Sequence, residues 1–164
     1  MIAEYGELGT GNGELFLGGR QYALGQSHKH LPEMSKVCGL DHAPCFSPIV
    51  VPHYSGMEVT VPLFGRDVAL VKECYREYYG ERVKANGEGR GLVFFMDDPA
   101  AAEGGFLSSA GLSGSDALEV SAYGNSERIV LVARFDNLGK GASGAAIQNM
   151  NLVLGADERA GLVV

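Results

Sequence analysis

This sequence of 164 residues has few cysteines and no closely spaced cysteine pair, which bears on its redox chemistry and on the cellular compartment expected for it. The three cysteines, Cys38, Cys45 and Cys74, form no C-x-x-C motif and cannot all be bridged within one chain. This cysteine usage favours a reducing, cytoplasmic location. We expect Cys45 and Cys74 to pack as small apolar side chains, although Cys45 could also be interpreted as a nucleophile.

Excess positive charge and long apolar runs are also missing. A net charge of −7 leaves no basic face to displace counterions, so nucleic acid is not expected as a partner. No apolar run approaches the roughly 18–20 residues that cross a bilayer, so a membrane is not expected either. The acidic start, Met-Ile-Ala-Glu-Tyr-Gly-Glu, lacks the apolar segment of a secretory signal.

The sequence also lacks a complete catalytic motif of a common enzyme class. The sequence contains no G-x-S-x-G motif, no Walker loop and no recognisable partner for a nucleophilic cysteine. The composition is otherwise that of a globular protein, with 46% hydrophobic and 20% charged residues. The length predicts a single domain, residues 1–164, with a core of its own.

The hydrophobic pattern predicts strands mixed with a few helices. Alternating residues predict a strand over 57–64, and Asp67 is expected to cap a helix over 68–79. Further strands are predicted over 21–24, 45–51 and 91–96, a hairpin over 118–135 and helices over 31–39 and 143–154. The pattern lacks strict strand–helix alternation. It indicates an α+β fold with a mixed, mainly antiparallel sheet and helices on one face. The uncovered face would need polar side chains or another subunit.

The densest group of reactive side chains is Ser27-His28-Lys29-His30-Leu-Pro-Glu33, at a predicted strand-to-helix junction. A histidine here can act as general acid or base near neutral pH, and Glu33 could orient it or bind a cation. A pair of surface histidines in a polar turn explains the spacing equally well. A metal site is not predicted, because the further ligands it needs, such as His42 and His53, have no recognisable spacing.

A glycine cluster follows the last predicted strand. Gly139-Lys-Gly141-Ala-Ser-Gly144 fits G-x-G-x-x-G between a strand and a helix. A dinucleotide fingerprint also needs a second parallel strand with an acidic residue, and about twenty residues remain after Gly144. We interpret the match as a false Rossmann signal and keep the loop as a cofactor-contacting candidate. Asp136-Asn137 before it could contact a ligand or cap the helix, and Lys140 would add a positive charge.

Two motifs carry a resemblance to a known family. His-Lys-His-Leu-Pro-Glu-Met and Asp-Asn-Leu-Gly-Lys-Gly-Ala-Ser-Gly-Ala-Ala-Ile-Gln-Asn-Met are similar to segments of the N-acetyl-gamma-glutamyl-phosphate reductases. These enzymes are relatives of aspartate-semialdehyde dehydrogenase, and the shorter branch of the family is most similar. Smaller matches lie in the same order at Phe46-Ser-Pro48, at Gly56-Met57 and at Gly114-Ser-Asp-Ala117. The similarity runs from about Gln21 to Leu154.

The resemblance implies an NADP-dependent acyl-phosphate reductase of arginine biosynthesis. Its members begin with a Rossmann domain and carry a Pro-Gly-Cys-Tyr-Pro-Thr nucleophile motif, neither of which is in this sequence. The chain would then be the C-terminal catalytic and oligomerisation domain, similar to that of glyceraldehyde-3-phosphate and aspartate-semialdehyde dehydrogenases. Its partners would be its own N-terminal domain and a small acyl-phosphate substrate. Alone it would be inactive.

The same resemblance assigns roles to individual residues. His28 matches the catalytic histidine that handles protons for the cysteine. The positions near the substrate are Tyr22, Lys29, His30 and Glu33, and those near the cofactor are Asn137, Gly141 and Ala142. Many family members have an arginine where Ser55 stands, so its task would fall to another residue, Lys29 or Lys140 for example.

Two surfaces are expected to be buried in the parent protein. The helix within 139–154 has apolar residues on more than one side, so one side is expected to pack on the absent N-terminal domain. Apolar residues at 59, 61, 63, 130 and 132 predict a sheet face through which the chain forms a homo-oligomer. Alternatives to the reductase are therefore a self-associating structural module or an anion-binding domain of a related semialdehyde dehydrogenase.

Overall fold

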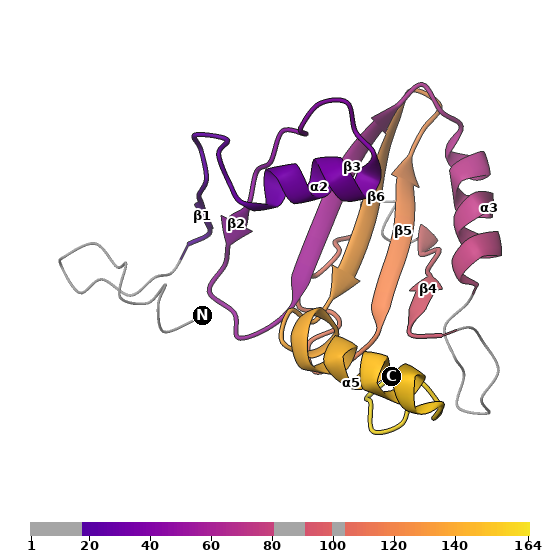
Figure 1. The fold of residues 1–164 in the computed structure, drawn as a ribbon. Helices are drawn as coiled ribbons and strands as arrows, with labels where there is room; N and C mark the ends of the chain where they lie inside the picture. Colours follow the sequence, from indigo (N-terminus) through magenta and orange to yellow (C-terminus); the bar gives the residue numbers. More distant parts are fainter. Residues whose placement is uncertain (1–17, 81–90, 100–103) are drawn as a thin grey trace. The chain divides into compact units, whose positions relative to one another are not determined.

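The computed structural model describes residues 18–80, 91–99 and 104–164, which fall into two compact units. The first unit ends at Tyr54 and the second runs from Ser55 to Val164. Each unit is described by itself below (Figure 1).

The first unit holds a short strand pair and one helix. Strand β1 (Arg20–Gln21) pairs antiparallel with β2 (Ile49–Val50), and helix α2 (His30–Cys38) lies between them in sequence. The helix confirms the prediction over 31–39 and ends at Gly39, whose φ of +62° suits glycine. Leu31 is the only buried hydrophobic residue among the described residues of this unit.

The predicted strands of the first unit are mostly wrong in extent. The run 45–51 forms a strand only at Ile49–Val50, because the prolines at 44, 48 and 52 cannot donate to a ladder. The strand expected over 21–24 ends early, since Ala23 has a φ of +53° and leaves the extended conformation. Cys45 is exposed and belongs to no strand, so its expected packing role is wrong.

The second unit is built on a four-stranded sheet in the order β3-β6-β5-β4. Its strands are β3 (Met57–Phe64), β4 (Val93–Phe95), β5 (Leu118–Gly124) and β6 (Arg128–Phe135). Strands β4 and β5 are parallel and the other pairs are antiparallel, which confirms the expected mixed, mainly antiparallel sheet. The predicted hairpin is β5–β6, and its Asn125 side chain accepts hydrogen bonds from the N–H groups of Glu127 and Arg128.

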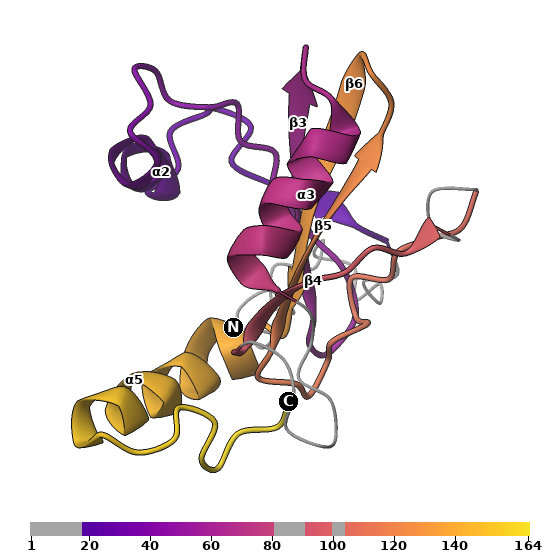
Figure 2. The same ribbon diagram turned by 90° about the vertical axis from the view of Figure 1, so that its right-hand side faces the viewer.

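Helix α3 (Val68–Tyr79) packs along β4 and β5 on one face of the sheet (Figure 2). Asp67 caps it as predicted, accepting a hydrogen bond from the Ala69 N–H at 2.8 Å. The Tyr75 ring contacts that of Phe95 at 6.3 Å, so α3 covers the sheet face that carries Phe95. Cys74 is exposed rather than packed as expected, because only one side of the helix faces the sheet.

The strand register corrects the predicted apolar face. Val61 lies opposite Leu131, whereas Val130 lies opposite Pro62. Side chains of directly paired residues share a face, so the residues at 59, 61 and 63 lie on one face and those at 130 and 132 on the other. Val59 pairs with Ala133, Ala133 with Val120, and Val120 with Phe95, so these four side chains share one face. The residues at 59, 61 and 63 therefore lie on the face that α3 covers at β4 and β5.

The C-terminal helix α5 (Gly144–Leu154) confirms the helix predicted over 143–154 and follows a π-helical turn η1 (Gly139–Ser143). It lies at the end of the sheet where β6 ends (Figure 1). Its exposed apolar side chains are Met150, Leu152, Val153 and Leu154. Within the described part of the chain, none of the helices is long and apolar enough to cross a membrane.

Candidate functional site

His28 lies at the centre of a cluster of rings in the first unit. Its imidazole is 4.6 Å from that of His30, 5.1 Å from the Phe46 ring and 5.7 Å from the Tyr22 ring, measured between centroids. The side chain is half-buried, between aromatic walls and solvent. The structure therefore brings together His28, His30 and Tyr22, three of the residues assigned to catalysis and substrate binding.

The hydrogen bonding of His28 defines which ring nitrogen can act on a ligand. The backbone N–H of His30 donates to Nδ1 of His28 at 3.2 Å. Since a backbone N–H can only donate, Nδ1 must be the unprotonated nitrogen, and the neutral ring carries its proton on Nε2. In this geometry Nε2 is the atom that can hand a proton to a reacting group, and Nδ1 serves to orient the ring.

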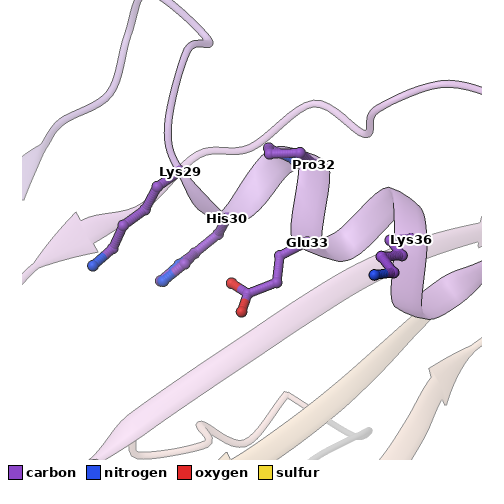
Figure 3. Close-up of a pocket in the computed structure, with 5 residues that line it drawn as sticks. All are labelled: Lys29, His30, Pro32, Glu33 and Lys36. Atoms are coloured by element: carbon purple, nitrogen blue, oxygen red, sulfur yellow. The ribbon is translucent and has the colours of Figure 1, made fainter.

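The remaining assigned residues of the first unit line a shallow surface pocket on α2. Its walls are Lys29, His30, Pro32, Glu33 and Lys36. The side chains of Lys29, His30 and Glu33 project to the same side of the helix (Figure 3). Two ammonium groups and one carboxylate give this surface a positive balance, which suits an anionic ligand. Lys36 was not predicted, although its place one helical turn after Glu33 was a signal for it.

Asp136 in the second unit is buried and accepts several hydrogen bonds. Its Oδ2 accepts from the Ser55 hydroxyl at 2.9 Å and the Gly114 N–H at 2.5 Å, and Oδ1 accepts from Leu138 and Gly139 N–H at 2.7 and 3.0 Å. Burial alone would raise the pKa of the carboxyl. The donors outweigh burial and hold the pKa below its ordinary value of 3.8.

The glycine cluster is explained by internal packing. The Leu138 and Gly139 N–H groups donate to Asp136, and the Gly141 N–H donates to the Asp136 carbonyl at 2.8 Å. A Cβ on Gly139 would lie 2.8 Å from the Ser115 carbonyl oxygen, and one on Gly144 would collide with the Asp116 carboxylate. Carboxylates of the chain itself thus occupy the place where a helix N-terminus would bind an anion, which argues against the anion-binding alternative.

The assigned cofactor residues lie beside this buried carboxylate. The Gly56 N–H donates to Oδ1 of Asn137 at 2.9 Å, so the Asn137 amide must keep its oxygen toward Gly56 and present its Nδ2 hydrogens outward. Gly141 and Ala142 are exposed within the η1 turn. Asn137, Gly141 and Ala142 thus lie in one segment, from which the Asn137 Nδ2 could donate a hydrogen bond to an amide.

Ser55, which stands where many relatives have an arginine, and Lys140 both form bonds within the chain. Ser55 is buried and its hydroxyl is bonded to Asp136 and Ser113, so this side chain turns inward. Lys140 donates to the Gln148 side chain, and its burial, opposed by Glu158 and Asp116, lowers its pKa. Ser55 is buried and the Lys140 ammonium is bonded to Gln148, so Lys29, which is exposed, is the remaining candidate for binding an anion.

Metal binding finds no support in the parts of the chain that the structure describes. No group of three or more His, Cys, Asp or Glu side chains among those residues could hold a metal ion. Reactive side chains gather around His28 in the first unit and around Asp136 in the second.

The sequence model of the semialdehyde dehydrogenase dimerisation domain matches residues 13–137, which is more than half of the chain. The chain belongs to this family.

Several N-acetyl-gamma-glutamyl-phosphate reductases are similar to the chain. The enzyme of Allorhizobium ampelinum is 42% identical over 137 residues, which cover 82% of this chain and 44% of that protein. The enzyme numbered 2 of a Nostoc species is 36% identical over 152 residues, covering 86% and 45%. That of Rhizobium meliloti is 39% identical over 137 residues, covering 82% and 44%. The chain spans less than half the length of these curated relatives.

Proposed function

We propose that the chain is the C-terminal portion of an NADPH-dependent reductase that converts N-acetyl-gamma-glutamyl phosphate to the semialdehyde. The observation that carries this proposal is the orientation of His28, whose Nε2 is left to transfer a proton while no thiol partner is recognisable in the sequence. The reductases that resemble the chain support the choice of substrate.

In this proposal a cysteine on another segment of the parent protein attacks the acyl carbon and phosphate leaves, forming a thioester. NADPH, when bound, supplies the hydride that reduces it. The reduced adduct would then release the aldehyde and the cysteine sulfur. His28 would give its Nε2 proton to that sulfur as it leaves, and Tyr22 and His30 would keep the ring in place. Lys29 and Glu33 would bind the charged groups of the substrate, on the side of α2 where they project (Figure 3).

Asn137 is proposed to meet the nicotinamide amide. Its Nδ2 can only donate, so it would bind the carbonyl oxygen of that amide, and the exposed Gly141 and Ala142 would lie against the ring. These residues fit the cofactor but supply no phosphate-binding strand–turn–helix unit, so the main binding contacts would come from an N-terminal nucleotide-binding domain. The exposed apolar side of α5 would pack on that domain.

The experiment that tests this proposal is an assay of the chain alone. With NADPH and the acyl phosphate, we expect no oxidation of NADPH above the rate without protein, because the nucleophile is missing. Detectable reduction by the isolated chain would contradict the proposal. The reading frame upstream of Met1 offers an independent check, since the proposal requires a cysteine-containing Rossmann segment there.

Self-association is the second function that we propose, and it is compatible with the first in the parent protein. The supporting observation is that Phe64 and Val130 are 67% and 43% exposed on the sheet face opposite α3. A helix covers the other face at β4 and β5, so this face is the one that a second copy would cover. The printed description of the family as a dimerisation domain supports this choice.

Size-exclusion chromatography with light scattering tests the second proposal. The Val130→Asp variant should shift the chain toward monomer, because a charge would be buried at the interface. The matched Val61→Asp variant changes a valine on the α3 face that is 50% exposed, against 43% for Val130, and should associate as the unchanged chain does. Equal behaviour of the two variants, or a monomeric unchanged chain at high concentration, would contradict it.

A further inference from the structure

The turn before His28 has an unusual backbone. Ala23 and Gln26 have φ values of +53° and +52°, and the Gln26 N–H donates to the Ala23 carbonyl at 3.0 Å. Residues with a side chain seldom adopt this conformation, and where they do the strain often belongs to a functional site. Gly25 lies in the same turn but does not have a positive φ. The strain thus falls on a residue that keeps a long polar side chain.

The Gln26 side chain holds one other residue by both of its backbone groups. Its Nε2 donates to the Phe46 carbonyl at 2.7 Å, and its Oε1 accepts from the Phe46 N–H at 2.9 Å. A primary amide has a donor end and an acceptor end. It can therefore pair with the N–H and the C=O of one residue, as the backbone of a neighbouring strand would. We call this pair of bonds the Gln26 clamp. A glutamate at 26 would keep only the acceptor end.

The residue held by the clamp forms one wall of the His28 site. The Phe46 ring is 5.1 Å from the His28 imidazole, tilted by 50°, and 6.2 Å from that of His30. Because both backbone groups of Phe46 are held, its backbone cannot move away from Gln26 without breaking both bonds, and this limits where the ring can lie. Among the residues of this unit that the structure describes, Leu31 is the one buried hydrophobic side chain, so we infer that local bonds of this kind help to hold the site.

We propose that Gln26 is a positioning residue for His28. It fixes Phe46 against the imidazole, and the strained backbone at 26 is what directs its side chain toward Phe46. The inference rests on the proposed function only in taking His28 as the proton-transferring group. The clamp itself can be tested without any activity.

Proton NMR of the His28 ring tests the clamp in this chain. Phe46→Leu removes the ring current and calibrates the shift of the His28 carbon-bound protons. Gln26→Gly, which relieves the positive φ and deletes the clamp, should reproduce most of that shift. Gln26→Glu, which keeps the acceptor end, should produce a smaller shift in the same direction. Gln21→Ala, a change of an exposed glutamine in β1, should leave the His28 signals in place.

Unchanged His28 signals in both Gln26 variants, with Phe46→Leu still shifting them, would overturn the proposal. Loss of the α2 amide signals in Gln26→Glu as well as in Gln26→Gly would also overturn it, since the clamp would then hold the fold rather than the ring. Retained α2 signals together with a graded His28 shift are the result that we expect.

Turnover by the full-length protein separates this inference from the proposed function. Gln26→Glu should lower kcat about tenfold or more with a nearly unchanged KM, because a small misplacement of a catalytic group can cost up to about 10²-fold. Unchanged kcat in this variant, with His28→Ala inactive, would overturn the positioning role alone. Full activity of His28→Ala would overturn the proposed function and leave the NMR result standing.

Discussion

The two units of the molecule hold their reactive side chains by different means. In the second unit Asp136 is buried at the end of a four-stranded sheet, beneath donors from three separate segments. In the first unit His28 stays half-buried in the loop before α2, and Leu31 is the one buried hydrophobic side chain among the residues of this unit that the structure describes. The difference indicates that the sheet unit is the stable scaffold, whereas the His28 site depends on a few side-chain-to-backbone bonds.

The largest expected effect comes from the core of the sheet unit. Phe94→Ala should lower the free energy of unfolding by about 3–5 kcal/mol, because the side chain is fully buried. The matched change in the other unit, Leu31→Ala, should expose the amides of α2 to hydrogen exchange and leave those of β5 and β6 protected. Urea unfolding and hydrogen exchange measure the two effects. Loss of protection in β5 after Leu31→Ala would break the distinction between the units.

Removal of the Asp136 carboxylate should have the next largest effect. Asp136→Ala leaves four donors without their acceptor, and we expect a loss of about 2–4 kcal/mol in unfolding free energy. Asp157→Ala is the control, since that carboxylate also accepts a backbone N–H but is exposed. A urea midpoint that moves equally in both variants would show that burial does not matter at this site.

Acid should weaken the sheet unit through the same carboxyl group. The folded pKa of Asp136 lies below its ordinary value of 3.8, so its ionised form stabilises the fold. This contribution is fully present above about pH 4, near the unfolded pKa, and is lost as pH falls through the lower folded pKa. The urea midpoint should therefore fall with pH in that range. In the Asp136→Asn variant the dependence should be weaker, and an identical profile would contradict the role given to this group.

The smallest predicted effect compares the starts of α3 and α2. Asp67→Ala removes the capping bond to Ala69 and should cost about 1 kcal/mol of unfolding free energy. Lys29 at the start of α2 makes no side-chain capping bond, so Lys29→Ala should leave the stability unchanged. Thermal unfolding followed by circular dichroism measures both. A larger loss for Lys29→Ala would reveal a contact of this side chain that stabilises the first unit.

The sequence predicted the regular elements of the second unit because their patterns are long and local. The run 57–64 alternates, Asp67 precedes a helical repeat, and the β5–β6 hairpin has a turn signal. The faces could not be predicted in the same way, since β6 is apolar on both sides and only the register tells Val61 from Val130. The two short strands of the first unit depend on prolines and on Ala23, which periodicity does not describe.

The candidate site was predictable as a set of residues but not as a geometry. His28, His30 and Tyr22 are close in sequence, and the structure brings their rings together. Gln26 and Ser55 were missed because each acts on a residue about twenty to eighty positions away, at Phe46 and Asp136. The glycines at 139 and 144 suggested a cofactor loop, whereas their lack of a Cβ admits Ser115 and Asp116. Long-range pairing of this kind leaves no periodic signal.

One kinetic comparison tests the central claim that the imidazole at 28 transfers protons for a thiol elsewhere in the parent protein. In the full-length protein, kcat for acyl-phosphate reduction should fall at least about 10²-fold in His28→Asn. The same substitution at the neighbouring His30 should cost far less, because that ring supports His28 and is not assigned proton transfer. Near-normal kcat in His28→Asn, or an equal loss in both variants, would contradict the account.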